Sequence, residues 1–323
     1  MLLWRGWLRS FAWTLGGVLA IVMGALVVSD PYDTARPFDL GLRGTAATSP
    51  RLAHASRARD PRFTGAILGN SHVQLLSPAR LASATGIPFV SLTVPGSGAK
   101  ETRAMLDWYM AHRPTPPAAL VFGIDEFQCG EGREPLQTNP FPFWLYRTST
   151  AGYLRGLFSL DSLRAMGGRV LYAALGWLPP VTDGYWDYEE GRTWTRPSLP
   201  AGGPPAGAPA LPAEGLTLPG LDYLESDIAR LPPDTAVILV RPPAHASQFA
   251  PPGSAQQARE VACLQRLDAL AAQRPRTALL DFRRADPAWT DAEHFWDSTH
   301  YRRPLAERME AEIAAALAAL RKG

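Results

Sequence analysis

The sequence has few cysteines and a small net charge, and each of these features argues against certain classes of protein. Among 323 residues there are two cysteines, Cys129 and Cys263, too few for a disulfide framework. They either pair in an oxidising compartment or stay as two buried thiols. The net charge is +2, and no Lys/Arg block runs between aromatic residues, so nucleic-acid binding is not indicated. Hydrophobic residues at 46% and charged residues at 19% are typical of a globular chain.

One apolar run, residues 11–28, is long and carries no charge; Arg5 and Arg9 precede it, and Asp30 and Asp33 follow. A helix needs about 20 apolar residues to cross the hydrocarbon core, so the run predicts a single transmembrane anchor. The basic flank predicts a cytoplasmic N-terminus, with the rest of the chain periplasmic or otherwise extracytoplasmic. A cleaved signal peptide is the alternative, but the run is long and no clear A-x-A site follows it.

Short apolar runs that end in polar or glycine-rich turns are typical of buried strands. Here they alternate with segments of helical periodicity, which predicts an α/β fold in which helices cover both faces of a parallel five-stranded sheet, a three-layer α/β/α arrangement. In such sheets ligands bind outside the carboxyl ends of the strands, where this chain places its polar turns. The expected strands are residues 63–68, 89–94, 118–124, 236–240 and 277–282.

The predicted organisation is a cytoplasmic tip and anchor at 1–29, a linker at 30–60 and an α/β domain at 61–323. Residues 128–218 break the strand–helix rhythm and form an insertion rich in aromatics, proline and glycine. After a predicted cap at Asp161, one helical face of the insertion carries Leu163, Met166, Val170, Leu171 and Ala174. The insertion's aromatics include Trp144, Tyr146, Tyr153, Trp177, Tyr185, Trp186, Tyr188 and Trp194; they fit ordinary packing better than sugar stacking, although both interpretations stay open.

Two stretches far apart in the sequence together supply the parts of a nucleophilic site. Ser71 follows the first predicted strand in a turn relaxed by Gly69, and Asp297 and His300 precede the last helix. A serine hydroxyl is a poor nucleophile unless an oriented base takes its proton. His300 is the candidate base and Asp297 the group that orients it through Nδ1. The backbone N–H groups of Ser71 and Gly96 are candidate oxyanion donors, each worth about 2.7–4 kcal/mol in such sites.

Simpler interpretations compete with this one. A serine after a strand often caps the next helix, and an isolated histidine before a helix is usually a surface residue. His294, Asp297 and His300 stand at three-residue steps but do not make a complete zinc site, because no cysteine or second acidic cluster accompanies them. We therefore expect no metal and no cofactor. The serine after the first strand, the late Asp-x-x-His and the glycine turns are more specific together than separately.

With these motifs the chain resembles the SGNH (GDSL-like) hydrolase superfamily, and within it the membrane-anchored, alginate-O-acetyltransferase-like branch. Gly69-Asn70-Ser71 is similar to the first block of that family, and Gly96 to the second-block glycine. Asp297 and His300 match the Asp-x-x-His block before the last helix, with the aromatic Tyr301 following as in many relatives.

The resemblance covers about residues 60–127 and 234–321, and it includes the Pro-Pro-x-His that ends at His245. The third block departs from the family pattern, because Asp125 stands where the family has an oxyanion-donating Asn. An ionised carboxylate cannot donate. Asp125 is then protonated, or Asn70 or a backbone amide takes over the donor role, or the site is weakened.

The resemblance implies an SGNH-type acyltransferase in the bacterial inner membrane, with its catalytic domain in the periplasm. Ser71 would carry an acetyl group, His300 would act as general base and acid, and Asp297 would orient it. The acceptor would be a cell-surface or exported polysaccharide, and a membrane-embedded protein would deliver the acyl group. A carbohydrate esterase with the same triad is one alternative, and a degenerate polysaccharide-binding scaffold is another.

Four further residues are candidates for substrate binding because they lie beside the expected site. His72 follows Ser71 directly, and Asp125 ends the third predicted strand. Arg241 and His245 follow the fourth strand, where His245 either binds substrate at the rim or bonds to a loop carbonyl.

Overall fold

The computed structural model forms two compact units, each assembled from two separate parts of the chain. The first, called here the anchor unit, combines Met1–Arg59 with Pro142–Val181. The second, the α/β unit, combines Asp60–Phe141 with Thr182–Gly323. The structure describes residues 2–39, 41–130, 140–147, 149–176, 181–200 and 216–321.

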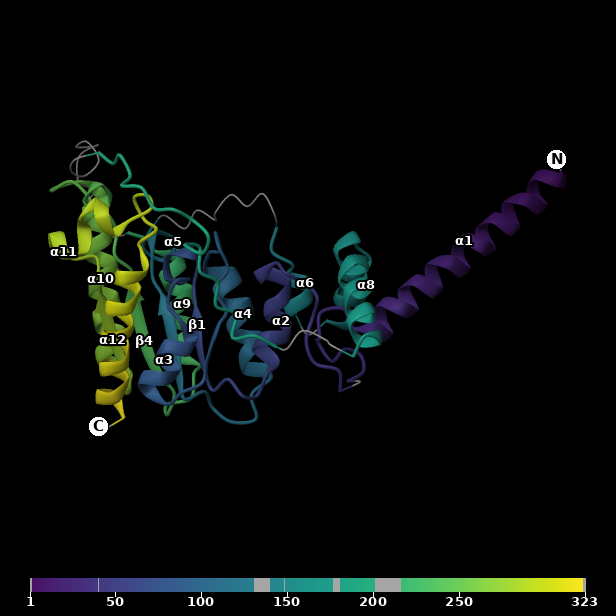
Figure 1. Cartoon of the computed structure of the whole chain (residues 1–323), viewed down its shortest axis with the longest axis horizontal. Coiled ribbons are helices and arrows are strands. Elements are labelled where there is room, and N and C mark those ends of the chain that lie inside the picture. Colours follow the sequence, from purple (N-terminus) through teal and green to yellow (C-terminus); the bar gives the residue numbers. More distant parts are fainter. Residues whose placement is uncertain are drawn as a thin grey trace. The chain divides into compact units, whose positions relative to one another are not determined.

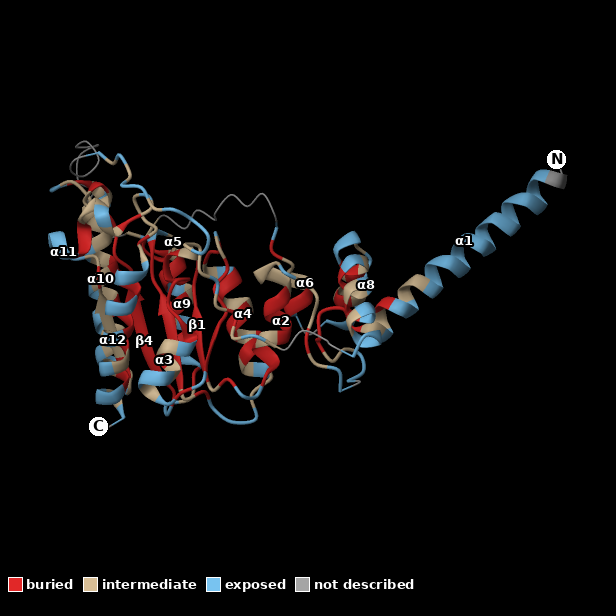
Figure 2. Cartoon of the chain, in the orientation of Figure 1, coloured by how far each residue is buried: buried red, intermediate tan, exposed pale blue. Residues whose placement is uncertain are grey.

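The α/β unit is organised around a five-stranded sheet in the order β2-β1-β3-β4-β5, with every neighbouring pair parallel (Figure 1). The predicted α/β class and the parallel five-stranded sheet are confirmed. Strands β1 to β4 are buried along their whole length (Figure 2), as expected where helices cover a parallel sheet, whereas the edge strand β5 is buried only at Thr277 and half-buried beyond it. The strands are β1 (Gly65–Leu68), β2 (Phe89–Ser91), β3 (Ala119–Gly123), β4 (Ala236–Arg241) and β5 (Thr277–Asp281).

The helices of this unit follow from local sequence signals. Ser77 caps α3, with Pro78 in its first turn and the left-handed Gly86 at its end, and Pro304 opens α12. The apolar stripe of α12 enters the same core as β1 and β4. The helices are η1 (Ser71–Val73), α3 (Pro78–Thr85), α4 (Ala99–Ala111), α5 (Glu126–Cys129), α9 (Pro219–Ala229), η2 (Ala246–Gln248), α10 (Ala255–Gln273), α11 (Pro287–Thr290), η3 (Ala292–His294) and α12 (Arg303–Leu320).

A disulfide joins Cys129 at the end of α5 to Cys263 in α10. The sequence left open whether these cysteines pair; the structure pairs them across 134 residues of chain. The bond ties the short helix after β3 to the long helix before β5, and residues of both helices line one cavity.

The anchor unit is all helical: α1 (Leu2–Ser29), α2 (Pro50–Arg59), α6 (Phe143–Tyr146), α7 (Thr150–Leu157) and α8 (Leu160–Ala174). Within α1, the 26 residues Trp4–Ser29 form one helix that is long and apolar enough to cross a membrane. Where α1 ends, the interior turns polar. Asp33 is buried and pairs with Arg59 of α2 at 2.8 Å. Arg169 of α8 donates to the carbonyl of Asp30 and, at 2.7 Å, to that of Leu42.

Several segment expectations differ from the structure in detail. The stretch expected as a linker, 30–60, contains α2 and buried charged residues, which apolar periodicity cannot reveal because polar contacts hold it. The stretch 128–218 is divided: residues 142–181 group with the anchor unit, and 182–200 with the α/β unit. The cap of α8 is Ser159, not Asp161, because the Ser159 hydroxyl accepts from the N–H of Ser162. Trp177 lies outside the described residues.

Candidate active site

Two glycines let the turn after β1 press against the end of β3. Gly69 has a φ of +145°, which favours glycine, and a Cβ there would lie 2.8 Å from a Val73 methyl group. A Cβ on Gly123 would lie 2.6 Å from the same side chain. With no Cβ at either position, Val73 packs over both strand ends, and η1 sits directly on the sheet. Ser71, the first residue of η1, is thereby fixed at the carboxyl edge of the strands.

Ser71, His300 and Asp297 form a continuous hydrogen-bonded chain. Nε2 of His300 lies 2.9 Å from the Ser71 hydroxyl, and Nδ1 lies 2.8 Å from a carboxylate oxygen of Asp297. A carboxylate only accepts, so Nδ1 carries the proton and Nε2 is left to accept from the serine. This is the arrangement of a nucleophile, a general base and an orienting carboxylate. The structure therefore brings together three residues that are 229 positions apart at their extremes.

Hydrogen bonds between the Asp297 side chain and the backbone of the same loop hold the loop that carries Asp297 and His300. One oxygen of Asp297 accepts from the backbone N–H groups of Thr299 and His300, both at 2.8 Å, while the other oxygen holds the imidazole. Burial opposes ionisation of Asp297, but these three hydrogen bonds outweigh it and keep its pKa well below the usual value. Asp297 is therefore an anion across the physiological pH range.

Asn70 sits between Ser71 and Asp125. Its side-chain oxygen accepts from the N–H of His72 at 3.0 Å, and its Nδ2 donates to a carboxylate oxygen of Asp125. An amide nitrogen has two hydrogens, so one remains for a ligand beside Ser71. The N–H of Ser71 itself makes no hydrogen bond with the described part of the chain. Both predicted oxyanion donors on this turn thus have a hydrogen to offer.

Gly96, the third predicted oxyanion donor, lies in the turn after β2. Its φ of +67° makes this a position that favours glycine. The turn is tied to the one that bears Ser71, because the hydroxyl of Ser97 and the N–H of Val94 both donate to the carbonyl of Gly69, at 3.3 and 2.9 Å. Pro95 lines the same cavity as Ser71.

Asp125, which replaces the expected Asn, is held by hydrogen-bond donors. Besides Asn70, it accepts from the N–H of Phe127 at 2.8 Å and lies 3.3 Å from Nδ1 of His72. Burial disfavours charge on His72, but the hydrogen bond and charge of Asp125, with the charge of Glu126, raise the pKa of His72. The His72 ring also meets the His300 ring edge to face, with centroids 5.3 Å apart.

His72, Asp125 and Glu126 are also the one group in the described ranges whose ligand atoms lie close enough to share a metal ion, within 4.8 Å of one another. Two of the three already share a hydrogen bond, and no fourth protein ligand joins them in the described chain. His294, which the sequence set beside Asp297 and His300, instead lies 3.6 Å from Glu293.

A cavity of about 320 Å³ opens beside Ser71 and His300. Gln74 is buried in its wall and donates to the carbonyl of Trp186 at 3.2 Å, while its side-chain oxygen has no partner in the described structure. An unpaired buried acceptor is costly, so it favours a ligand that donates to it. The cavity is lined by Ser71, Gln74, Pro95, Trp186, Tyr188, Arg192, Trp296, Asp297 and His300.

Aromatic residues of this cavity divide into packed and exposed ones. Tyr188 is partly buried, donates to the carbonyl of Tyr301 and meets the His300 ring edge to face at 5.7 Å. Trp296 donates to Glu189 at 2.7 Å and lies under the guanidinium of Arg192, 4.2 Å away. Trp186, by contrast, is half exposed and offers an apolar face beside the serine.

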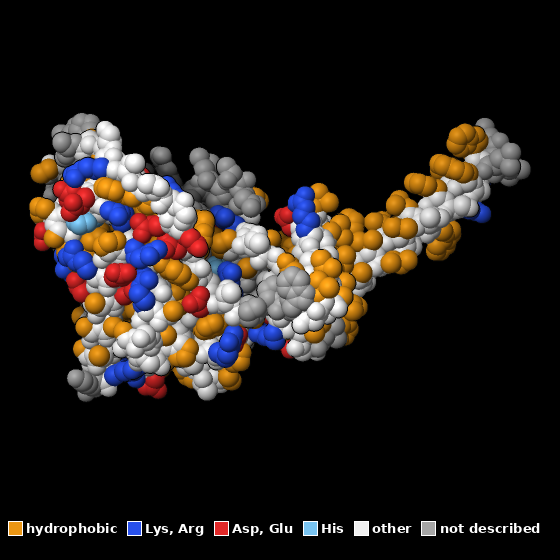
Figure 3. All heavy atoms as spheres, in the orientation of Figure 1, with side chains coloured by type: hydrophobic (Ala, Val, Ile, Leu, Met, Phe, Trp, Pro, Cys, Tyr) orange, Lys and Arg blue, Asp and Glu red, His pale blue; other side chains and the backbone are white. Residues whose placement is uncertain are grey.

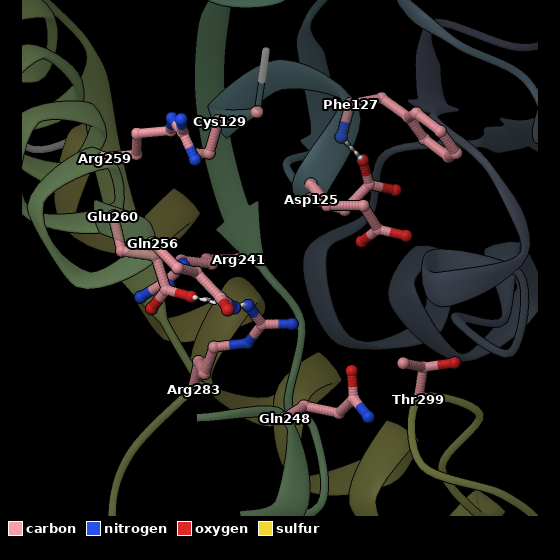
Figure 4. Close-up of a pocket in the computed structure, with 12 residues that line it drawn as sticks. Asp125, Phe127, Cys129, Arg241, Gln248, Gln256, Arg259, Glu260, Arg283 and Thr299 are labelled. Carbon is pink, nitrogen blue, oxygen red and sulfur yellow. Dashed lines mark hydrogen bonds and ion pairs between the residues drawn. The ribbon is translucent and has the colours of Figure 1, made fainter. Parts of the chain in front are cut away.

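A second cavity, of about 510 Å³, has an acidic wall and a basic wall (Figure 4). Asp125 and Glu126, at the start of α5, form the acidic wall. Arg241 at the end of β4 is buried in the opposite wall, where it pairs with Glu260 at 3.0 Å and Asp281 at 3.2 Å. The cavity is lined by Asp125, Glu126, Phe127, Cys129, Gly130, Arg241, Gln248, Gln256, Arg259, Glu260, Arg283 and Thr299.

Arg283 extends its guanidinium toward the centre of this second cavity (Figure 4). Burial, and then the positive charge of Arg241, lower the pKa of Arg283. Its Nε is buried without a hydrogen-bond partner among the described residues. Thr299 precedes His300 in the chain, so this cavity borders the same loop as the catalytic candidates.

His245, a predicted substrate-binding residue, has a structural role. Its Nδ1 accepts from the N–H of Ser247 at 3.1 Å and caps η2, and its own N–H donates to the carbonyl of Ser298 at 3.0 Å. Burial lowers the pKa of His245. It lines neither cavity; instead it holds the loop between Asp297 and His300.

Sequence reasoning missed Gln74, Arg192, Trp296, Arg259 and Arg283. For Trp296 a signal existed, since it directly precedes Asp297. The sequence holds no such signal for the three arginines, because isolated basic residues on helices and loops are most often solvated. Gln74 likewise looks like any polar residue after a serine turn until its oxygen is seen to be buried.

No family model matches the sequence, and no curated protein matches it. The geometry of the site therefore carries the functional argument.

Proposed function

We propose that this protein is a serine-dependent O-acyltransferase, most simply an O-acetyltransferase, that acts outside the cytoplasm on a cell-surface or exported polysaccharide. The observation that carries the proposal is the Ser71–His300–Asp297 chain, with 2.9 Å and 2.8 Å contacts at the carboxyl edge of a parallel sheet. Such distances are those expected of a competent nucleophile and base, about 2.6–3.2 Å.

In the first half-reaction the Ser71 oxygen attacks the carbonyl carbon of an acyl donor while its proton passes to Nε2 of His300. The leaving group departs with that proton, and the acyl group stays on the serine. Asp297 keeps the imidazole in the required tautomer and offsets its positive charge. The N–H of Ser71, the amide of Asn70 and the N–H of Gly96 stabilise the oxyanion.

In the second half-reaction a sugar hydroxyl loses its proton to His300 and attacks the acyl-serine. The ester forms on the sugar, and the proton returns to Ser71. The exposed face of Trp186 and the unpaired acceptor of Gln74 suit a ring that is apolar on its face and bears donating hydroxyls. The larger cavity, with Asp125 and Arg241 on opposite walls, offers polar groups for further sugars.

The cellular setting belongs to the same proposal. The helix α1 would hold the protein in a bacterial inner membrane with the α/β unit in the periplasm, an oxidising compartment in which the Cys129–Cys263 disulfide persists. A membrane-embedded partner would supply the acyl group. In this proposal the helices beside the sheet form the three-layer arrangement of an SGNH-like domain, and contacts of α12 with β4 and β5 and of α10 with β5 support it.

A hydrolytic esterase is the second candidate, because the imidazole of His300 is partly exposed and water can reach the acyl-serine. Both activities use one acyl-enzyme, so they differ only in the acceptor. Transfer of acetyl from a donor ester to an added oligosaccharide indicates the transferase, and release of acetate alone indicates the esterase.

The proposal is tested by labelling the full-length protein with a fluorophosphonate probe. We expect labelling of the wild type and its loss in Ser71→Ala and His300→Ala. The matched control is His112→Ala, which removes a histidine whose Nδ1 bonds to the carbonyl of Trp108 outside the site. Labelling that persists in Ser71→Ala, or a folded wild type that takes no label, contradicts an acyl-enzyme mechanism.

A further inference from the structure

Helix α8 of the anchor unit buries its polar face and exposes its apolar one. The residues it buries are Ser162, Ala165 and Arg169. Its outer surface carries Leu160 and Leu171, which are 70% and 56% exposed. Successive residues of an α-helix are turned by about 100°, so Leu160 and Leu171 share one face while Ser162, Ala165 and Arg169 lie on the opposite one. Val170 and Leu175, also exposed, extend the apolar face.

The orientation of α8 is fixed by hydrogen bonds from its polar face. The Ser162 hydroxyl lies 3.1 Å from that of Tyr32, and Arg169 binds the carbonyls of Asp30 and Leu42. Turning the helix to bury its leucines would take these partners away from the Tyr32 hydroxyl and from the carbonyls of Asp30 and Leu42, and a buried polar group without a partner costs about 1–3 kcal/mol. The outward apolar face is therefore a property of the fold.

This face continues the apolar surface of α1. Helix α8 packs against α1 and stands beside the end of it (Figure 1). Val28, in the last turn of α1, is 58% exposed, and Tyr32 and Asp30, which follow it, are the residues that bond to α8. In Figure 3 hydrophobic side chains are spread along α1 and over the adjoining part of this unit.

We propose that the outer face of α8 lies in the interface of the lipid bilayer that α1 crosses. A soluble protein rarely exposes a contiguous apolar patch without a partner. An amphipathic helix whose apolar side sinks to the level of the headgroups is a well-known partner for lipid. The face holds one cation, Arg164, whose long stem can lie along the acyl boundary while its head stays in water beside Asp161, 3.3 Å away.

Lipid is the occupant that the structure favours because the patch begins where the membrane-spanning helix ends. The inference rests on α1 crossing the membrane, and it is independent of the chemistry proposed for Ser71. It makes α8 a second membrane contact, one that restrains rotation of the anchor unit about the axis of α1.

The test places a fluorescent label on this face in the full-length protein, reconstituted at one copy per lipid nanodisc. Both natural cysteines are paired, so a single introduced cysteine reacts alone. Leu171→Cys carries an environment-sensitive dye, and Val261→Cys, an exposed apolar residue of α10 in the α/β unit, is the matched control. Quenching is measured with nitroxide-bearing lipids and, separately, with iodide in the buffer.

We expect dye at position 171 to emit at shorter wavelength than at 261, to be quenched severalfold more by lipid nitroxide, and to be protected from iodide. Equal iodide quenching at both positions would overturn the proposal, since α8 would then face water. A dye at position 171 that is protected from iodide but not quenched by lipid nitroxide would also overturn it. In that case a protein surface, such as a second copy, would cover the face of α8. Retention of the disulfide and of the circular dichroism spectrum checks that each labelled variant is folded.

Discussion

The α/β unit and the anchor unit distribute polar and apolar residues in opposite ways. In the α/β unit the strands and the inner stripe of α12 bury apolar side chains, and the polar groups gather at the carboxyl edge of the sheet. In the anchor unit α1 and α8 present apolar side chains outward, and Asp30, Asp33 and Arg169 are buried (Figure 2). In α8, therefore, an apolar helix face is not a face buried in protein.

The largest effect that we expect comes from a substitution in the α/β unit. His300→Ala removes the group that takes the proton from Ser71, and it should lower the rate of ester turnover by about 10⁴-fold or more. A steady-state assay with an activated acetyl ester measures it. His112→Ala should leave the rate within about twofold, as expected for a histidine away from the reaction. A His300→Ala enzyme that keeps a tenth of the wild-type rate would contradict the role of His300 as base.

The next largest effect is on the stability of the anchor unit, and it distinguishes two adjacent residues of α8. Arg169→Leu takes the buried cation away from Asp30 and leaves the carbonyl of Leu42 unpaired in the interior, so it should lower the unfolding free energy by about 3–5 kcal/mol. Val170→Asn changes an exposed residue and should shift it by at most about 0.5 kcal/mol in detergent micelles lacking bilayer order. Urea unfolding of the anchor unit, followed by tryptophan fluorescence, measures both. Equal costs would mean that the polar interior does not hold this unit together.

Asn70→Ala tests whether the turn after β1 stabilises the oxyanion. Loss of one such donor should lower kcat by about 10²–10³-fold. Because the donor acts only when charge develops, KM should change little. Steady-state kinetics with the same acetyl ester separate the two constants. A variant in which KM rises and kcat is unchanged would make Asn70 a substrate-binding residue instead.

The smallest effect concerns the pH dependence of stability. Burial opposes charge on His72, but Asp125 raises the pKa of His72 in the folded state, with Glu126 and Arg283 also facing it. A raised pKa means that the folded protein holds this proton more tightly than the unfolded chain does. The stability gained is then fully present below the unfolded value, about 6.5, and is lost as pH rises through the raised value.

We therefore expect the difference in unfolding free energy between wild type and His72→Gln to shrink as pH rises above about 6.5. Denaturation at a series of pH values measures this difference. Subtracting one unfolding free energy from the other cancels the contributions of the titratable groups that both proteins share. Asp125→Asn should abolish the trend, because it removes the charge that raises the pKa. A difference that grows with pH would reverse the sign of the argument.

The sequence predicted the sheet well because its strands are short, uniformly apolar and ended by glycine or polar turns. It also singled out Ser71, Asp297 and His300, because each of them lies in a short motif of neighbouring residues. The structure brings these three side chains together. Their role in catalysis stays a prediction. Contacts made by the fold were out of reach, such as the unpaired oxygen of Gln74 and the position of Arg283 in the second cavity.

The anchor unit was harder to predict for a physical reason. Its interior depends on hydrogen bonds between residues more than 100 positions apart, such as Tyr32 with Ser162, and no periodicity records them. The pattern of Leu163, Val170 and Leu171 correctly indicated a helix, but a pattern cannot tell whether an apolar face meets a protein core or a lipid surface.

The most direct test of the central claim is to trap the acyl-enzyme. Full-length protein is mixed with an activated acetyl ester and quenched in acid within the first turnovers, and its mass and peptide map are recorded. We expect one added acetyl group, carried by Ser71 and absent from Ser71→Ala. An ester that is turned over while the acetyl group appears on another residue, or on none, would contradict it.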